Sequence, residues 1–272
     1  MRRGVLFLTT AFVMFAASKD ARADEVHELK KELAIDLPVT GSMLLLGLGF
    51  ELAKADIVPL DARWTSVNKV DEGARNLMRW ENPSVAGTVS DVLLIGSPFV
   101  AIGTLGAAAA SDDAFRKTPV DALIVVEATS ANMLLNQVVK FAAARERPYG
   151  HYPTPLQPTP TADARVSFYS GHTSTTFCLA SASGTVAYLR GYDLAPLAWI
   201  PGAALAAFTG YLRIAADKHY FTDVITGAIV GTAMGMFIPL VFHGRVNESS
   251  PPSTPSAGAP LTTQAFSFGS SF

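Results

Sequence analysis

The chain has 272 residues, of which 49% are hydrophobic and 16% are charged, and its formal net charge at pH 7 is −2. The charged fraction lies well below the roughly 25% of an average soluble domain, which favours a membrane or an unusually buried helical bundle. The near-neutral balance excludes a nucleic-acid partner that needs a basic face, and the single cysteine, Cys178, excludes an intrachain disulfide framework.

The first residues resemble a targeting signal. Two arginines, Arg2 and Arg3, precede an apolar stretch over residues 4–17, and residues 21–23 (Ala-Arg-Ala) fit the small-residue pattern of a cleavage site. We therefore interpret residues 1–23 as a secretory signal peptide. An uncleaved membrane anchor is the alternative interpretation.

Residues 24–88 are predicted to form a surface or re-entrant helical segment. The uncharged run over residues 37–50 is short for a membrane-spanning helix and suits an interfacial or re-entrant helix better. The polar stretch that follows contains Trp64, Trp80 and an amphipathic segment between them, which is typical of a segment lying along a membrane surface.

Five apolar runs follow within residues 89–245, and each is close to the roughly 20 residues that a spanning helix needs. They cover residues 92–110, 122–139, 173–189, 194–212 and 224–242. The pattern predicts an all-α fold, a helical bundle of about six core helices embedded in a membrane. A soluble bundle is the alternative, because the third and fourth runs are polar enough to pack against protein.

Small residues and low complexity mark the end of the chain. Gly227, Gly231 and Gly235 recur every fourth residue in the last apolar run, which predicts close approach of another helix. Residues 246–272 are rich in Ser and Pro with almost no charge, and this composition is typical of a disordered tail.

Polar side chains gather where the apolar runs begin or end. Lys140 and Arg147 lie seven residues apart, so on a helix both cations share one face. Ser170, Gly171 and His172 directly precede another predicted helix, whose unpaired backbone N–H groups suit an anion.

A third polar cluster lies between the last two apolar runs. Arg213 ends one predicted helix, and His219 and Asp223 are four residues apart at the start of the next, so the carboxylate can accept a hydrogen bond from the imidazole. One lysine and two arginines suit a dianionic phosphate. An imidazole backed by a carboxylate can act as a nucleophile, while a second imidazole protonates a leaving oxygen. The three clusters together therefore predict phosphate-ester chemistry.

His219 and Asp223 alone could bind a metal ion, but the nearby cysteines or additional carboxylates that would complete such a site are lacking. We therefore predict no metal and no cofactor. Three other histidines, His27, His151 and His243, are assigned no function. The charged residues Arg145, Asp217 and Lys218 are predicted to face solvent, and Cys178 to be a small packed side chain.

The three clusters in this order resemble the motifs of the type 2 phosphatidic acid phosphatase superfamily, which includes lipid phosphatases, bacterial acid phosphatases and vanadium haloperoxidases. The resemblance covers about residues 89–243. Two positions depart from the family pattern: Tyr169 stands where proline is usual, and Leu212 where serine is usual. Neither position is central to the family's chemistry, so the departures bear more on substrate preference than on activity.

The resemblance implies a role for each matching residue. It implies that His219 attacks phosphorus and forms a phosphohistidine, that Asp223 orients His219, and that His172 protonates the leaving oxygen and later activates water. It also implies that the remaining motif residues bind the phosphate. These are Lys140, Arg147, Ser170, Gly171 and Arg213.

The expected function is a metal-independent phosphatase for phosphate monoesters or pyrophosphates of a membrane lipid. The alternatives are a soluble periplasmic acid phosphatase, a vanadate-dependent haloperoxidase and a non-catalytic lipid-phosphate binder. A phosphorylated lipid or small phosphate ester and the membrane are the expected partners. The motifs do not distinguish phosphatidate, phosphatidylglycerol phosphate, undecaprenyl pyrophosphate, lipid A phosphates and small soluble esters.

The orientation follows from charge in the short loops at the end opposite the motifs. Those loops carry Arg116, Lys117, Arg190 and Arg245, and an excess of basic residues is typical of cytoplasmic loops. We therefore expect an inner-membrane protein whose active site faces the periplasm, with a soluble periplasmic protein as the alternative. A cleaved signal peptide would agree with this orientation only if residues 37–50 do not cross the bilayer.

Overall fold

The computed structural model describes residues 26–153 and 161–246. The predicted signal peptide and the predicted tail after residue 246 lie outside these residues. All of the regular structure in the described part of the chain is helical apart from two isolated β-bridges, which confirms the all-α prediction.

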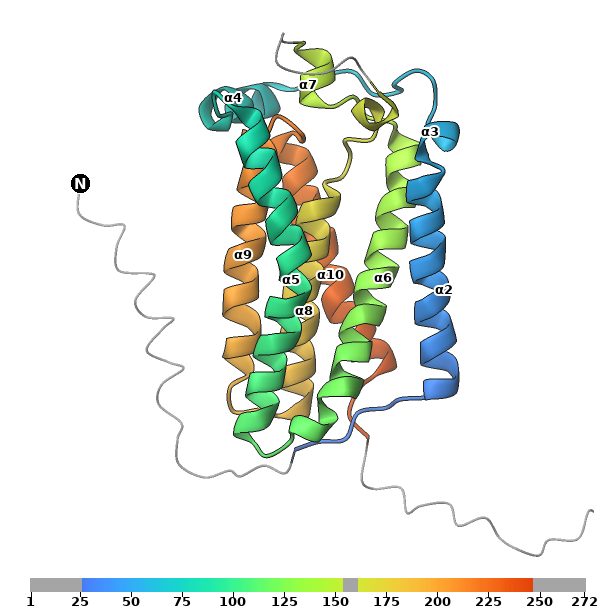
Figure 1. Cartoon of the computed structure of the whole chain (residues 1–272), viewed down its shortest axis with the longest axis vertical. Helices are drawn as coiled ribbons and strands as arrows, with labels where there is room; N and C mark the ends of the chain where they lie inside the picture. Colours follow the sequence, from blue (N-terminus) through green and yellow to red (C-terminus); the bar gives the residue numbers. More distant parts are fainter. Residues whose placement is uncertain (1–25, 154–160, 247–272) are drawn as a thin grey trace, which may run out of the picture.

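Six long helices form an elongated bundle (Figure 1). They are α2 (Leu33–Leu52), α5 (Pro83–Ser111), α6 (Thr118–Ala143), α8 (Gly171–Arg190), α9 (Ala195–Ala215) and α10 (Phe221–Phe242). Shorter elements lie in the connections: α3 (Lys54–Ile57), α4 (Lys69–Met78), α7 (Pro148–His151) and the 3-10 turns η1 (Phe115–Lys117) and η2 (Ala162–Arg165). Four of them, α3, α4, α7 and η2, cover one end of the bundle (Figure 1), which we call the capped end; we call the other the open end.

Helix α8 is the centre of the bundle, where it contacts α5, α6, α9 and α10. Its side chains are mostly small, and fifteen of its residues are buried. The glycine stripe of α10 lies directly against the backbone of α8: a Cβ atom on Gly231 would lie 2.1 Å from the carbonyl oxygen of Ser174, and one on Gly235 would lie 2.5 Å from that of Cys178. This confirms the prediction that the glycine stripe allows another helix to approach closely.

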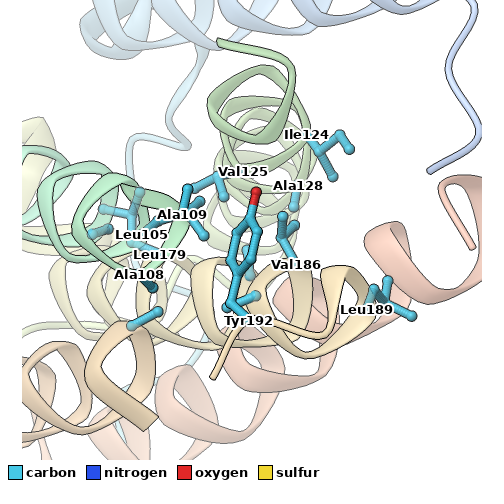
Figure 2. Close-up of a cluster of buried hydrophobic side chains, with 14 of the residues drawn as sticks. Leu105, Ala108, Ala109, Ile124, Val125, Ala128, Leu179, Val186, Leu189 and Tyr192 are labelled. Atoms are coloured by element: carbon cyan, nitrogen blue, oxygen red, sulfur yellow. The ribbon is translucent and has the colours of Figure 1, made fainter. Parts of the chain in front are cut away.

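The apolar core extends toward the open end. Figure 2 shows the ring of Tyr192 inserted among side chains of α5, α6 and α8, including Ala109, Val125 and Val186. Cys178 is buried in the same cluster, as predicted.

Five helical segments of the described chain are long and apolar enough to cross a membrane: α2, α5, η1 with α6, α9 and α10. Large apolar side chains on their outward faces are exposed, for example Leu45 (71%), Phe99 (77%) and Ile229 (64%). Since exposing so much apolar surface to water is unfavourable, these faces indicate a bundle embedded in lipid. Helix α8 has 20 residues but is not among the five, because its sequence is rich in Ser and Thr and is less apolar.

Helix α2 differs from the sequence interpretation. Its apolar run covers residues 37–50, but the helix extends over Leu33–Leu52 and has 20 residues, which is enough to span a hydrocarbon core. The extra turns carry Asp36 and Glu51, charged residues that lie near the helix ends. The re-entrant interpretation depended on the short uncharged run over residues 37–50, whereas the helix itself is long enough to span the membrane.

Candidate active site

The three polar clusters lie together at the capped end of the bundle. Lys140 is in the last turn of α6, His172 in the first turn of α8 and Arg213 in the last turn of α9. His219 lies in the connection to α10, and Asp223 is in the first turn of α10. Figure 1 shows that these four helix ends lie at the same end of the bundle, below the short elements that cover it.

The two ring nitrogens of His219 face groups of opposite charge. Its Nε2 atom lies 3.1 Å from Nη1 of Arg147, and its Nδ1 atom lies 3.7 Å from Oδ2 of Asp223. The side chain is buried, and Nδ1 has no hydrogen-bond partner among the described residues. The carboxylate favours a proton on Nδ1, which leaves the lone pair of Nε2 directed toward the guanidinium of Arg147.

Arg147 is fixed by the segments on both sides of it. Its guanidinium donates to the backbone carbonyls of Asp163 (2.7 Å) and Lys218 (2.9 Å), and it forms an ion pair with the Asp163 carboxylate at 3.1 Å. The Asp163 carboxylate also pairs with Lys54. A carboxylate held by two cations occupies the kind of environment that suits a bound phosphate.

His172 and Arg213 share a carboxylate that lies outside the three motifs. Asp91 of α5 lies with Oδ1 at 2.7 Å from Nε2 of His172 and at 3.1 Å from Nη1 of Arg213. Arg213 also donates to the hydroxyl of Ser90 at 2.8 Å, while its Nε atom has no partner in the described part of the chain. In the sequence, Asp91 is marked only by its place directly before the long apolar run that begins at residue 92.

Lys140 approaches the start of α8. A Cβ atom at Gly171 would lie 3.2 Å from Nζ of Lys140 and 2.9 Å from Oδ1 of Asn136, so a residue larger than glycine would crowd both side chains. Ser170 is fully buried and caps α8, because its hydroxyl accepts from the backbone N–H of Thr173. Its own backbone N–H donates to the carbonyl of Asp223 at 3.1 Å, so the Ser170 turn is joined to the first turn of α10.

Asp223 is held by several donors in addition to facing His219. Oδ2 accepts from the hydroxyl of Ser167 (2.6 Å) and from the backbone N–H of Tyr220 (3.0 Å), and Oδ1 accepts from Nη1 of Arg145 (2.5 Å). The Asp223 side chain is fully buried, and these three donors stabilise its carboxylate form.

The predictions that Arg145 and Asp217 face solvent are wrong. The Arg145 side chain is 1% exposed and pairs with Asp71 and Asp223. The Asp217 side chain is fully buried and pairs with Arg75 and Arg79. Isolated charges in a polar stretch gave no indication of these partners, because Asp71, Arg75 and Arg79 belong to a segment about 70 to 150 residues earlier in the chain.

Lys218 also differs from its prediction, since it is partly buried and its ammonium lies 4.9 Å from the ring centroid of Tyr149. Of the unassigned histidines, His151 pairs with Glu146, while His243 lies at the open end, where it contacts Glu127 and the carbonyl of Lys30. Neither takes part in the contacts of His219 described above.

The cations of the site change the ionisation of their neighbours. Burial, and then the charges of Arg147, Arg213 and Lys140, hold the pKa of His219 well below its usual value, so the imidazole is neutral near pH 7. Burial and the charge of Arg147 also lower the pKa of Lys218. Although burial opposes it, the charge of Arg147 helps to hold the pKa of Asp163 well below its usual range. A buried neutral imidazole surrounded by cations is suited to attack an anion.

Comparison with known proteins agrees with the motif resemblance. Residues 121–247 match the model of the PAP2 superfamily, and this segment contains all eight residues singled out from the sequence. The match confirms the resemblance to the type 2 phosphatidic acid phosphatase superfamily.

Individual relatives cover the chain only in part. A lipid A 1-phosphatase of Porphyromonas gingivalis is 37% identical over 76 residues, which are 28% of this chain and 16% of that protein. A PA-phosphatase related-family protein of Dictyostelium discoideum is 29% identical over 126 residues, 43% of this chain and 46% of that protein. The chain thus spans less than half the length of either relative. A crystal structure of a transmembrane PAP2-type phosphatidylglycerolphosphate phosphatase from Bacillus subtilis covers 74% of this chain and 92% of its own, with 19% identity and a TM-score of 0.35.

Proposed function

We propose that this PAP2-superfamily chain is a membrane phosphatase that hydrolyses phosphate monoesters or pyrophosphates of a membrane lipid through a phosphohistidine on His219, without a metal ion. The observation that carries the proposal is the setting of His219, whose Nδ1 faces a carboxylate and whose Nε2 faces the guanidinium of Arg147. This arrangement leaves a lone pair aimed at the place where cations would hold a phosphoryl group.

The first chemical step transfers the phosphoryl group to the enzyme. The Nε2 lone pair of His219 attacks phosphorus, and the bond from phosphorus to the leaving oxygen breaks. A proton passes from His172 to that oxygen, so the product leaves as a neutral alcohol or as a phosphate with one proton more. Asp223 stabilises the positive charge that develops on the ring of His219.

The second step regenerates the enzyme. Neutral His172 removes a proton from water as the water oxygen attacks phosphorus, and the P–N bond breaks to return the lone pair to Nε2. In both steps, the negative charge on the equatorial phosphoryl oxygens is neutralised by three cations, Lys140, Arg147 and Arg213. The start of α8, with Ser170 and the N–H of Gly171, faces the same oxygens. The role of Asp91 is to hold His172 in place between the substrate and Arg213.

A lipid substrate is favoured by the position of the site. It lies at one end of a bundle whose outer faces carry exposed apolar side chains, where a lipid phosphate would reach it without leaving the membrane. The same exposed faces disfavour the soluble periplasmic alternative. The lipid A 1-phosphatase relative supports this substrate class, and a panel of phosphatidate, phosphatidylglycerol phosphate, undecaprenyl pyrophosphate and lipid A phosphates would identify the member.

The proposed orientation places the capped end in the periplasm. Helix α2 runs from the open end to the capped end (Figure 1), so if α2 spans the membrane, Leu33 lies on the cytoplasmic side. Because a cleaved signal peptide would deliver the new N-terminus to the periplasm, a cleaved signal, a spanning α2 and a periplasmic site are not compatible together.

The orientation can be tested by labelling with an impermeant maleimide in intact cells, because buried Cys178 is the sole cysteine. Of the two variants Ser66→Cys at the capped end and Ser111→Cys at the open end, we expect only Ser66→Cys to react.

The activity is tested on purified protein in detergent with excess EDTA. We expect phosphate release from at least one lipid phosphate, and loss of that release in His219→Ala. A wild-type protein that binds lipid phosphate but releases none would favour the non-catalytic binder, and bromide oxidation with added vanadate would favour the haloperoxidase.

A further inference from the structure

Helix α4 lies outside the segment that matches the family model, yet it packs on the candidate site. It covers Lys69–Met78, whereas the match begins at residue 121. Its neighbours are α9 and α10, the two helices joined by the connection that carries His219. Figure 1 shows α4 lying across the capped end of the bundle.

Asp71 joins α4 to the start of α10. Its side chain is fully buried; Oδ1 accepts from the backbone N–H of Thr222, and Oδ2 accepts from the Thr222 hydroxyl, both at 2.8 Å. Oδ2 also accepts from Nη2 of Arg145 at 2.7 Å. A carboxylate at the first turn of a helix satisfies a free N–H and opposes the positive end of the helix dipole. Asp71 therefore fixes the turn that contains Asp223.

Arg145 connects Asp71 to Asp223. One guanidinium nitrogen donates to each carboxylate, and both ion pairs are buried. The guanidinium carbon lies 4.1 Å from the ring centroid of Trp64 and 4.2 Å from that of Tyr220, so the group is held between two aromatic faces. With its plane fixed in this way, Arg145 places the carboxylate of Asp223 relative to that of Asp71.

A second ion pair joins α4 to the connection that carries His219. Arg75 donates to both oxygens of Asp217, at 2.6 and 2.8 Å, and Arg79 donates to one of them at 3.2 Å. Asp217 is two residues before His219 and has a φ of 58°, in the left-handed region that L residues seldom adopt. The bidentate pair stabilises this conformation, which sets the direction in which the chain enters His219.

We propose that α4 is a positioning element of the active site, with Asp71 and Arg75 as its positioning residues. Asp71 acts on Asp223 through Arg145, and Arg75 acts on His219 through Asp217. Neither residue touches the atoms that would hold phosphate. The inference rests on the proposed roles of His219 and Asp223, and it extends the functional unit to a segment that the family match does not contain.

This arrangement predicts a specific kinetic change. The ring of His219 lies 3.7 Å from the Asp223 carboxylate, and the attraction between these groups is strongest when the ring becomes positive during attack. Loss of an α4 contact should therefore lower kcat, by a factor of about 10 to 100 as for other groups that orient reacting residues. The binding of phosphate by Arg147 and Arg213 should be unchanged, so KM and the inhibition constant of inorganic phosphate should stay near the wild-type values.

The test compares Asp71→Asn with Glu72→Gln, which removes the same charge from the neighbouring, exposed position of α4. Each purified protein is assayed with p-nitrophenyl phosphate or the lipid phosphate that wild type hydrolyses, and with inorganic phosphate as inhibitor. We expect kcat to fall in Asp71→Asn alone, with KM and phosphate inhibition unchanged. Wild-type kcat in Asp71→Asn, or a higher KM with unchanged kcat, would overturn the proposal.

A second pair of variants keeps the test decisive if Asp71→Asn does not fold. Arg75 is 14% exposed, so Arg75→Gln and the conservative Arg75→Lys disturb the interior less. We expect kcat to fall in Arg75→Gln and to recover in part in Arg75→Lys, at matched thermal unfolding midpoints. Equal kcat in both variants and wild type would overturn the proposal. An inactive wild type would instead contradict the proposed function, which separates the two failures.

Discussion

The two ends of the bundle both bury arginine–carboxylate pairs, but they use them differently. At the open end, Arg190 donates to Asp121 at 2.6 and 2.8 Å and to the carbonyl of His27, and Tyr192 donates to the second oxygen of Asp121. At the capped end, Nε of Arg213 and Nδ1 of His219 have no partner among the described residues. Buried polar groups that lack partners are costly and gather at functional sites. The comparison suggests that the open end is built for stability and the capped end for an anion.

The largest effects are expected from two arginine substitutions, one of which should lower activity and the other stability. Arg213→Gln removes a proposed phosphate ligand, so we expect kcat/KM to fall by a factor of about 100 to 1,000 with little loss of stability. Arg190→Gln leaves the fully buried Asp121 without its charge partner, which should cost about 3 kcal/mol of unfolding free energy. Activity assays and chemical unfolding of both variants measure the difference; an equal loss of activity in folded Arg190→Gln would remove the distinction between the ends.

A smaller effect is expected at Asp91, compared with Asp112 at the other end of the same helix. Asp91→Asn weakens the hold on His172, so hydrolysis of an alkyl phosphate should fall on the order of tenfold. Hydrolysis of p-nitrophenyl phosphate should fall less, because its leaving group needs no proton. Asp112→Asn should change neither rate. Equal losses on both esters in Asp91→Asn would show that Asp91 does not act through proton transfer.

The smallest effect concerns pH and stability, with opposite signs at the two ends. The pKa of His219 is lowered on folding, mainly by burial. The stabilisation that His219 contributes to the folded state is therefore present above the unfolded value of about 6.5 and is lost as the pH falls below it. Burial lowers the pKa of His243, but hydrogen bonds to Glu127 and to the Lys30 carbonyl outweigh burial and raise it. The stabilisation that His243 contributes to the folded state is therefore present below about 6.5 and is lost as the pH rises through the folded pKa.

Thermal unfolding between pH 5 and 8 tests both signs. His219→Gln should remove part of the destabilisation seen at low pH, and His243→Gln should remove part of the loss seen as the pH rises. Identical pH profiles in wild type and both variants would contradict these assignments.

The sequence predicted the helical architecture well because the apolar runs mark the lipid-facing and core helices directly. It also predicted that the motif residues share one end, since each motif lies at the boundary of an apolar run. Helix α2 was underestimated because Asp36 and Glu51 lie in its terminal turns, so counting only the uncharged residues shortened it. Charge at a helix end is tolerated where the helix leaves the hydrocarbon region.

The contacts of the site with α4 could not be predicted in the same way. Asp71 lies in a polar amphipathic segment, and nothing in its local pattern separates it from exposed Glu72. The prediction that Arg145 faces solvent fails because its two carboxylate partners lie 74 and 78 residues away in sequence. Such pairs depend on how distant segments fold over one another, which hydrophobic periodicity does not encode.

The most direct test of the account is to trap the phosphoenzyme. The enzyme is mixed with a substrate labelled with 32P in its phosphoryl group, quenched in alkali, and digested so that the labelled peptide can be identified. We predict a label that is stable to base and labile to acid, located on His219 and absent from His219→Ala. A label on another residue, or turnover by His219→Ala at the wild-type rate, would contradict the central claim that His219 is the nucleophile.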